Sequence, residues 1–514
     1  MTASGVATPT YLDIEKSASI TNSPSGLSSR FPFRIKEIDE NGELCRIYES
    51  RPSVNNSFDT TRLTSHLMPT SKVSLNSVST VQYLVNVFLP TGYPYSVTPD
   101  YFDYQIFDSF QAFSSSIASL FANRAVLSAV GVGDQSASST SALFMKIVQE
   151  TIGRLGTIGF AWKFGSALEP ECKKYRFMAD IFNDSAMVFD CLSPLFPFDK
   201  KLVVGMLCMS GLLRSICGVM AGGSRAALTQ HFTDPVRGSI ADVNAKDQSQ
   251  ETVISLMGML AGSLVVGVVK GEGVAMWAVV ATLLTLHLWT NYRAVSSVVL
   301  KSLNRQRANI VFSDIHKSLA ELKQTAQVDV NFDMSLSRLL LTPKKVARRE
   351  NILEPDGAVR NSDGKIIGYA YFDGFETISS NAQNLNISIT ELVKVTSDWG
   401  YIIWYQVLDN KLTRVYITLL DEDNSSSTTG SGDLRAWAHA YLIANAVSSY
   451  FSMRGSFEEK YDISDPLALI KTTADTLTTI FDELRITKAL KLCGWDLSNR
   501  NIISHPVKKV FIEK

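Results

Sequence analysis

Three long apolar runs lie close together in the middle of the chain. They cover Leu202–Ser224, Thr252–Val269 and Gly273–Tyr292. The first run carries one charged residue, Arg214, and the other two carry none. At a rise of about 1.5 Å per residue, such runs form helices about 27–35 Å long, which matches the hydrocarbon core of a bilayer. The pattern therefore predicts that the middle of this protein is embedded in a membrane.

Three further helices are predicted before these runs. Asp103–Val130 repeats apolar residues at intervals of three or four, and Tyr175–Leu195 ends at prolines. Ser141–Trp162 carries a glycine at every third position between Gly153 and Gly159, a pattern typical of helices that touch closely in a membrane bundle. We therefore predict a bundle of about six helices, near residues 103–130, 141–164, 174–196, 201–222, 250–270 and 272–303.

The two ends of the chain have a different, more polar pattern. Residues 1–79 read as a disordered or linker region with a short strand at Leu44–Glu49, and Val81–Leu89 reads as a further strand. After residue 308, strands are predicted at Lys365–Phe372, Tyr401–Leu408 and Thr413–Leu420. Helices are predicted at Asp314–Gln327, Ile387–Val395, Asp433–Tyr450 and Pro466–Leu490. A flexible loop is predicted at Asp421–Gly432. The fold class is therefore mainly α: a membrane-associated helical domain over 80–307, followed by a smaller α+β domain over 308–514.

Composition and motifs exclude several classes of function. A net charge of −1 gives no basic field for nucleic acid. The six cysteines are scattered, and Cys208 and Cys217 read as packing residues inside an apolar run, so we expect no metal site. No phosphate-binding loop, nucleophile elbow or paired-histidine zinc motif occurs in the sequence. We therefore expect neither a catalytic site nor a cofactor.

The polar segment between the first two apolar runs, from Ala221 to Thr252, is the main candidate site. It gathers charged and titratable residues of both signs: Arg225, His231, Asp242, Lys246, Asp247 and Glu251. If it is a loop, Arg225 and Lys246 can converge on a small anionic group such as a phosphate, with the acidic residues orienting them. The alternatives are a solvated connector, or a helix start capped by Asp247 or Ser249.

Two ionisable residues lie inside the apolar runs. An arginine buried in a bilayer is costly unless it is paired, so we expect Arg214 to lie near a carboxylate such as Asp180 or Asp184. Snorkelling to the interface and a place on a substrate or proton path are the alternatives for Arg214. His287 reads as a core histidine with satisfied hydrogen bonds rather than as a ligand.

Several blocks of sequence resemble the ROOT UVB SENSITIVE (RUS) family. They run in order along the chain: LPTGYPYSVTPDY at Leu89–Tyr101, RFMADIFND at Arg176–Asp184, AGGSRAALT at Ala221–Thr229, ADVNAKDQSQET at Ala241–Thr252 and NYRAV at Asn291–Val295. The C-terminal part resembles the family more loosely, chiefly through Gly494-Trp495. The resemblance implies a membrane-associated protein linked to vitamin B6 homeostasis and to light and UV-B responses. It also implies association with a RUS paralogue or with itself, and it supplies no catalytic residues.

These observations leave three functional interpretations. The first is a non-catalytic membrane scaffold or regulator that supports vitamin B6 homeostasis through partners. The second is a carrier of small, vitamer-like molecules that works as an oligomer, because a bundle of six helices resembles half of a facilitator-type transporter. The third, an enzyme that uses vitamin B6 as cofactor, lacks any recognisable phosphate-binding fold. We expect a membrane location, with an intracellular organelle as one option and no particular organelle indicated. Residues 1–30 contain Asp13 and Glu15 and show neither a secretory signal nor a clear plastid transit pattern.

Overall fold

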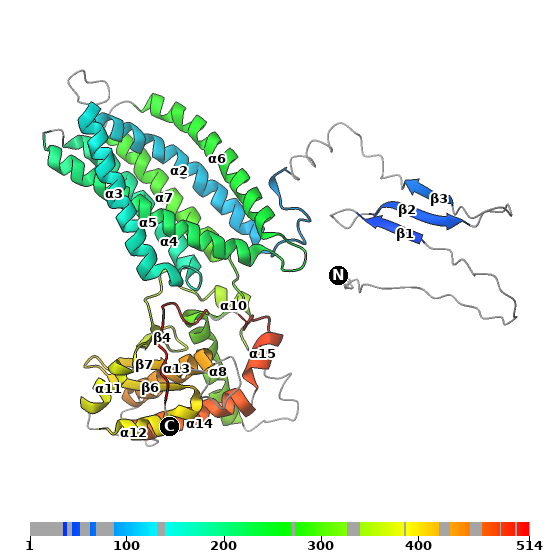
Figure 1. Ribbon diagram of the computed structural model, residues 1–514, viewed down its shortest axis with the longest axis vertical. Helices are drawn as coiled ribbons and strands as arrows, with labels where there is room; N and C mark the ends of the chain where they lie inside the picture. The colour runs from blue at the N-terminus through cyan, green and yellow to red at the C-terminus, as the bar shows by residue number, and fades with distance from the viewer. Residues whose placement is uncertain are drawn as a thin grey trace. The chain divides into compact units, whose positions relative to one another are not determined.

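The computed structural model describes residues 34–38, 44–51, 62–67, 87–130, 139–196, 198–269, 273–325, 340–384, 387–420, 432–452, 465–483, 485–498 and 501–512. These residues fall into two compact units, Met1–Ser79 and Thr80–Lys514. Each unit has its own secondary structure, and we describe the two separately (Figure 1).

The first unit contains an antiparallel sheet of three strands, β1 (Arg34–Ile38), β2 (Leu44–Arg51) and β3 (Arg62–Leu67), in the order β1-β2-β3. The predicted strand at Leu44–Glu49 is confirmed. The prediction of a linker region with one short strand is wrong for this part, because β1 and β3 complete a sheet around it. Most of the strand predicted at Val81–Leu89 lies outside the described residues, and its described residues Val87 and Phe88 are helical.

The second unit begins with six long helices in the described part of the chain, which confirms the predicted bundle. They are α2 (Tyr101–Val130), α3 (Ser139–Phe164), α4 (Cys172–Leu192), α5 (Lys200–Phe232), α6 (Ile240–Val268) and α7 (Val274–Ser297). Figure 1 shows them lying side by side along their lengths. The predicted end of the last helix, near residue 303, is wrong: the backbone is extended at Val298, and Val299 N donates instead to Asp100 Oδ2.

The predicted loop from Ala221 to Thr252 is wrong. Helix α5 continues to Phe232 and α6 begins at Ile240, so only residues 233–239 join them. The helix-forming residues Ala226, Ala227 and Leu228 carry α5 past its apolar run, and Pro235 is the first proline beyond it. The cap of α6 is Ser239, whose side chain accepts from Asp242 N, and therefore neither Asp247 nor Ser249 caps it.

Glycines allow close contacts between the bundle helices. A Cβ atom on Gly262 of α6 would lie 3.2 Å from Ile117 Cα of α2, and one on Gly258 would lie 2.8 Å from Phe113 O. On α3, a Cβ atom on Gly156 would lie 2.1 Å from Leu212 Cδ1 of α5. The close packing predicted for the α3 glycines thus holds at Gly156, whereas Gly159 faces open space.

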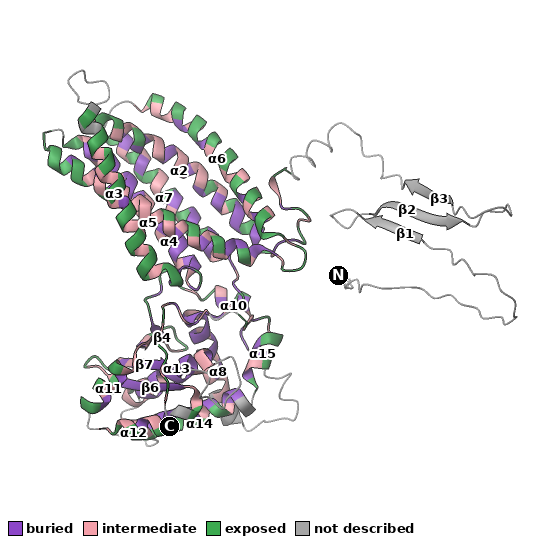
Figure 2. Ribbon diagram, viewed as in Figure 1, coloured by how far each residue is buried: buried purple, intermediate pink, exposed green. Residues whose placement is uncertain are grey.

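The outer faces of the bundle are apolar and exposed. Helices α5, α6 and α7 are long and apolar enough to cross a membrane, yet only 17%, 11% and 28% of their apolar windows are buried. Large apolar side chains such as Trp162 and Leu264 point outward, and Figure 2 shows exposed residues along α3 and α6. Exposing apolar faces along several long helices to water would be unfavourable, so these faces suit a lipid environment.

The C-terminal part is an α+β module, as predicted. Its sheet contains β4 (Ala358–Arg360), β5 (Ile366–Phe372), β6 (Tyr401–Val407) and β7 (Thr413–Leu419) in the order β4-β5-β7-β6. Strands β5 and β7 are parallel and the other pairs antiparallel. The helices are α8 (Arg305–Thr325), α10 (Pro343–Ala347), α11 (Phe375–Asn384), α12 (Ile389–Thr396), α13 (Gly432–Ser452), α14 (Pro466–Thr478) and α15 (Ile486–Leu492).

The strands and most helices of this module confirm the sequence predictions, with one exception. The single helix predicted at Pro466–Leu490 is wrong, because a π-helical turn (Thr479–Glu483) and the left-handed backbone of Arg485 separate α14 from α15. Strand β4 and helices α10 and α11 have no counterpart among the predicted elements. The predicted loop at Asp421–Gly432 lies outside the described residues except for Gly432, which begins α13.

Buried ion pairs join the bundle to this module. Glu350 lies between Lys173, at the start of α4, and Arg307 of α8, whose Nη1 is 2.9 Å from Glu350 Oε1. Burial acts to raise the pKa of Glu350, but these two cations outweigh it and lower the pKa below its usual value. The carboxylate is therefore ionised and holds the N-terminal end of α4 against the C-terminal module.

Candidate functional site

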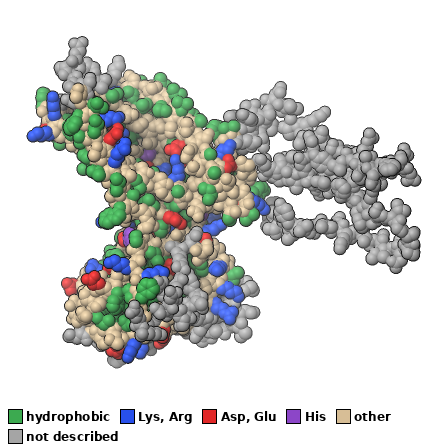
Figure 3. All heavy atoms as spheres, viewed as in Figure 1, with side chains coloured by type: hydrophobic (Ala, Val, Ile, Leu, Met, Phe, Trp, Pro, Cys, Tyr) green, Lys and Arg blue, Asp and Glu red, His purple; other side chains and the backbone are tan. Residues whose placement is uncertain are grey.

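A cavity of about 450 Å³ lies inside the helical bundle. Five helices line it: α2, α4, α5, α6 and α7. In Figure 3, acidic, basic and histidine side chains gather in a hollow of the bundle. Small-molecule sites commonly have about 300–1,000 Å³, so the cavity is large enough for a small ligand.

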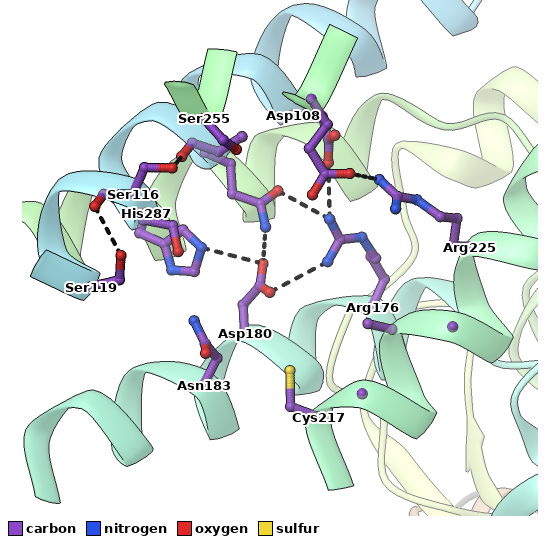
Figure 4. Close-up of a pocket in the computed structure, with 17 residues that line it drawn as sticks. Asp108, Ser116, Ser119, Arg176, Asp180, Asn183, Cys217, Arg225, Ser255 and His287 are labelled. Carbon is purple, nitrogen blue, oxygen red and sulfur yellow. Dashed lines mark hydrogen bonds and ion pairs between the residues drawn. The ribbon is translucent and has the colours of Figure 1, made fainter. Parts of the chain in front are cut away.

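The centre of the cavity is an ion pair between Arg176 and Asp180 of α4 (Figure 4). The Nη1 atom of Arg176 lies 3.3 Å from Asp180 Oδ1, and its Nη2 atom lies 2.9 Å from Asp108 Oδ1 of α2. Gln111 and Asn291 both donate to Asp180 Oδ2. All five side chains are at least nine-tenths buried. A connected polar network therefore lies between the helices, in the interior of a largely apolar bundle.

His287 of α7 extends this network. Its Nε2 atom is 3.8 Å from Asp180 Oδ2, and its Nδ1 atom is 2.7 Å from Asp184 Oδ1. The side chain is 1% exposed, which confirms the predicted core position, and it also lines the cavity. The satisfied hydrogen bonds predicted for it are not confirmed, because the contact of Nδ1 with Asp184 lacks hydrogen-bond geometry. A histidine placed between two carboxylates can carry a positive charge that they stabilise.

Arg225 of α5 forms a second cluster at the edge of the cavity. Its Nε atom lies 3.2 Å from Asp247 Oδ2, and its Nη2 atom donates to Glu251 Oε2. Gln105 Nε2 of α2 also donates to Asp247 at 2.6 Å. Arg225 therefore connects α5 to α6, and both Arg225 and Glu251 line the cavity.

The other residues predicted in this segment stabilise the helix ends instead. His231 Nε2 is 2.9 Å from Asp100 Oδ2, and Thr91 N donates to Asp242 Oδ2 at 2.7 Å. Lys246 Nζ donates to the carbonyl of Val87 at 3.0 Å and is not among the residues that line the cavity. The prediction that Arg225 and Lys246 converge on one pocket is therefore wrong, because the helical register directs Lys246 elsewhere.

Arg214 is paired, as predicted, but with a different carboxylate. Its Nη2 atom donates to Asp190 of α4, whose side chain is 2% exposed. Asp190 follows Asp184 by six residues, which places it about 120° around the helix. Asp180 and Asp184 therefore face α7, while Asp190 faces α5. The predicted pairing of Arg214 with Asp180 or Asp184 is wrong for this reason.

The sequence reasoning missed the residues of α2 that complete the site. Gln105, Asp108 and Gln111 recur at every third position of a helix rich in phenylalanine. Polar residues on one face of an apolar helix indicate a buried polar contact, and this spacing was the available signal. Arg176 begins the segment Arg176–Asp184, one of those that resemble the RUS family in sequence. Its place at the centre of the site nevertheless follows only from the packing of α4 between α2 and α5.

The fold and the cavity together define a helical-bundle protein that has, within the described residues, three helices long and apolar enough to span a membrane and a cavity lined by charged side chains. Residues 74–318 match the family model described as the vitamin B6 photo-protection and homoeostasis domain. That segment includes the whole bundle and the cavity. The chain belongs to the RUS, or root UVB sensitive, family.

The chain is 40% identical over 283 residues to RUS family member 1 of Dictyostelium discoideum, which covers 52% of this chain and 53% of that protein. It is 35% identical over 322 residues to protein root UVB sensitive 3 of Arabidopsis thaliana, covering 62% of this chain and 68% of that protein. The chain is also 25% identical over 239 residues to protein root UVB sensitive 2 of Arabidopsis, which is named chloroplastic. That alignment covers 46% of this chain and 53% of that protein. The alignments thus span about half to two thirds of these relatives. No solved structure matches the chain.

Proposed function

We propose that this protein is a membrane protein that binds and carries a small polar molecule through the cavity of its helical bundle, and that it serves vitamin B6 homeostasis in this way. The observation that carries the proposal is the cavity of about 450 Å³, in which ionisable side chains of five helices meet inside apolar surroundings. We propose no catalytic step for it.

Buried charges are the reason to favour a binding site over a purely structural core. An apolar core usually stabilises a bundle as well as, or better than, buried ion pairs do. Charged residues inside membrane helices therefore mark ligand or ion pathways more often than packing contacts. In this bundle the charges of Arg176, Asp180 and Arg225 border an open volume rather than being fully packed.

The link to vitamin B6 rests on the matched domain, which includes the cavity. Vitamin B6 compounds are small, polar and charged at neutral pH, and the cavity has the size and polarity for such molecules. Our other interpretation is a scaffold that acts only through a paralogue or a second copy. In that case the cavity has no part in function. The two interpretations therefore predict different effects of a bulky side chain in the cavity. It should block ligand binding by a carrier and leave the function of a scaffold unchanged.

Two glycines on α5 allow this test. Gly218 lines the cavity and Gly205 does not, and a Cβ atom on either would meet nothing within 4 Å. Leucine at either position also improves helix propensity by about 1 kcal/mol, so neither change should harm folding. Purified protein in liposomes should bind and take up labelled pyridoxine, pyridoxal or pyridoxamine. Gly218→Leu should lower binding at least tenfold, and Gly205→Leu should leave it unchanged.

A scaffold would behave differently. If the wild-type protein bound and transported none of the three vitamers, and Gly218→Leu still restored vitamin B6 levels in cells lacking the protein, the carrier proposal would fail.

A further inference from the structure

The charges around the cavity are not balanced, and this imbalance defines a ligand class. Five carboxylates lie at the cavity or directly beside it: Asp108, Asp180, Asp184, Asp247 and Glu251. The cations that contact them within the described residues are Arg176, Arg225 and the imidazole of His287. Even with His287 protonated, carboxylates outnumber cations by two.

Protein partners occupy every nitrogen of the Arg176 guanidinium and two of the three nitrogens of the Arg225 guanidinium. Every nitrogen of Arg176 donates to a protein group: Nε to Tyr104 Oη, Nη1 to Asp180, and Nη2 to Asp108 and Gln111. Arg225 uses Nε for Asp247 and Nη2 for Glu251. An incoming phosphate or carboxylate would have to displace the partners of Arg176, and at Arg225 it would meet the repulsion of Asp247 and Glu251.

We propose that the cavity selects an organic cation or amine-bearing zwitterion, with Asp108 and Glu251 holding its positive group, rather than an anion such as a phosphate ester. The inference rests on the proposed function for the location of the site and adds the charge of the ligand. Carboxylates are the acceptors that a positively charged nitrogen prefers in a partly desolvated site, because each ion pair there is weakly screened.

A pair of vitamers that differ by one phosphate gives the direct test. Pyridoxamine carries an aminomethyl group that is protonated at neutral pH, and pyridoxamine 5′-phosphate adds an anionic ester to the same ring. Equilibrium binding to the purified full-length protein in lipid nanodiscs should show pyridoxamine at least tenfold tighter. Equal or tighter binding of the phosphate would overturn the inference and leave the proposed function standing.

A matched pair of variants tests the role of the carboxylates. Glu251 lines the cavity and pairs with Arg225, while Glu150 on the outer face of α3 pairs with Arg154 at 3.9 Å. Glu251→Gln should weaken pyridoxamine binding about tenfold, the loss expected for one ion pair of about 1.4 kcal/mol. It should also strengthen binding of the phosphate, because Arg225 loses a partner. Glu150→Gln should change neither affinity, and an equal effect of both variants would count against the assignment.

A non-vitamer cation separates failure of this inference from failure of the proposed function. If choline binds and no vitamer does, the charge selectivity is supported and the link to vitamin B6 fails. If neither choline nor any vitamer binds, the cavity is not a ligand site and both proposals fall.

Discussion

Arg214 is the one charged residue within the apolar run of α5. Its partner Asp190 is almost fully buried, with a side chain 2% exposed, while the side chain of Arg214 is 39% exposed. Removing the arginine therefore leaves a buried carboxylate without its cation, which is more costly than losing the pair as a whole.

We expect Arg214→Leu to lower the stability of the purified protein by up to about 3 kcal/mol, and the double variant Arg214→Leu/Asp190→Asn to recover most of that loss. Thermal unfolding of wild type, both single variants and the double variant in one detergent measures this coupling. Equal and additive losses in the two single variants would show that the pair contributes nothing specific.

His439 gives the C-terminal module a predictable response to pH. It is completely buried, its Nδ1 atom lies 3.1 Å from Tyr401 Oη, and its Nε2 atom lies 2.9 Å from Thr473 Oγ1. Burial lowers the pKa of His439 from 6.5 to about 3. Between these values the unfolded chain binds one more proton than the folded one, so stability is fully present above pH 6.5 and falls as the pH drops toward 3.

Lowering the pH from 6.5 to about 5 should therefore reduce the free energy of opening of this module by about 2 kcal/mol. Hydrogen exchange of peptides from α13 in the full-length protein, corrected for intrinsic rates, measures it. His439→Gln should remove this part of the pH dependence. An unchanged pH slope in that variant would mean that other groups cause it.

At the scale of elements, apolar patterning predicted which segments are helices but not where they end. The apolar run ending at Ser224 marks where the surroundings become polar, whereas α5 ends only at Phe232, because its backbone meets no proline before Pro235. The candidate site was affected in the same way. Charge alone identifies Arg225 and Glu251 as candidates, but their partners across α5 and α6 depend on a helical register that a loop would not have.

The contact of α6 with α2 can be tested with two glycines of α6. A Cβ atom on Gly262 would lie 2.7 Å from Leu120 Cδ1 and 3.2 Å from Ile117 Cα, while one on Gly267 would meet nothing within 4 Å. Leucine raises helix propensity equally at both sites, so their difference reports packing. Gly262→Leu should be about 1–3 kcal/mol less stable than Gly267→Leu in thermal unfolding. Equal stability of the two would rule out the close α2–α6 contact.

For the whole molecule, the exposed apolar faces of α5, α6 and α7 predict integration into a membrane. Membranes from cells that express the full chain should retain the protein after washing with alkaline carbonate, which removes peripheral proteins. Release of the protein into the wash would contradict a membrane-spanning bundle and would require another partner for these faces.

The central claim, that the cavity binds a ligand, can be tested with a thiol that the protein already carries. Cys217 of α5 lines the cavity, while Cys208 of the same helix does not, and both are partly exposed. The rate at which N-ethylmaleimide alkylates each thiol can be followed by peptide mass spectrometry in reconstituted wild-type protein. With pyridoxamine at ten times its dissociation constant, alkylation of Cys217 should slow about tenfold and that of Cys208 should not change. Unchanged alkylation of Cys217, or equal slowing at both cysteines, would contradict a ligand site in the cavity.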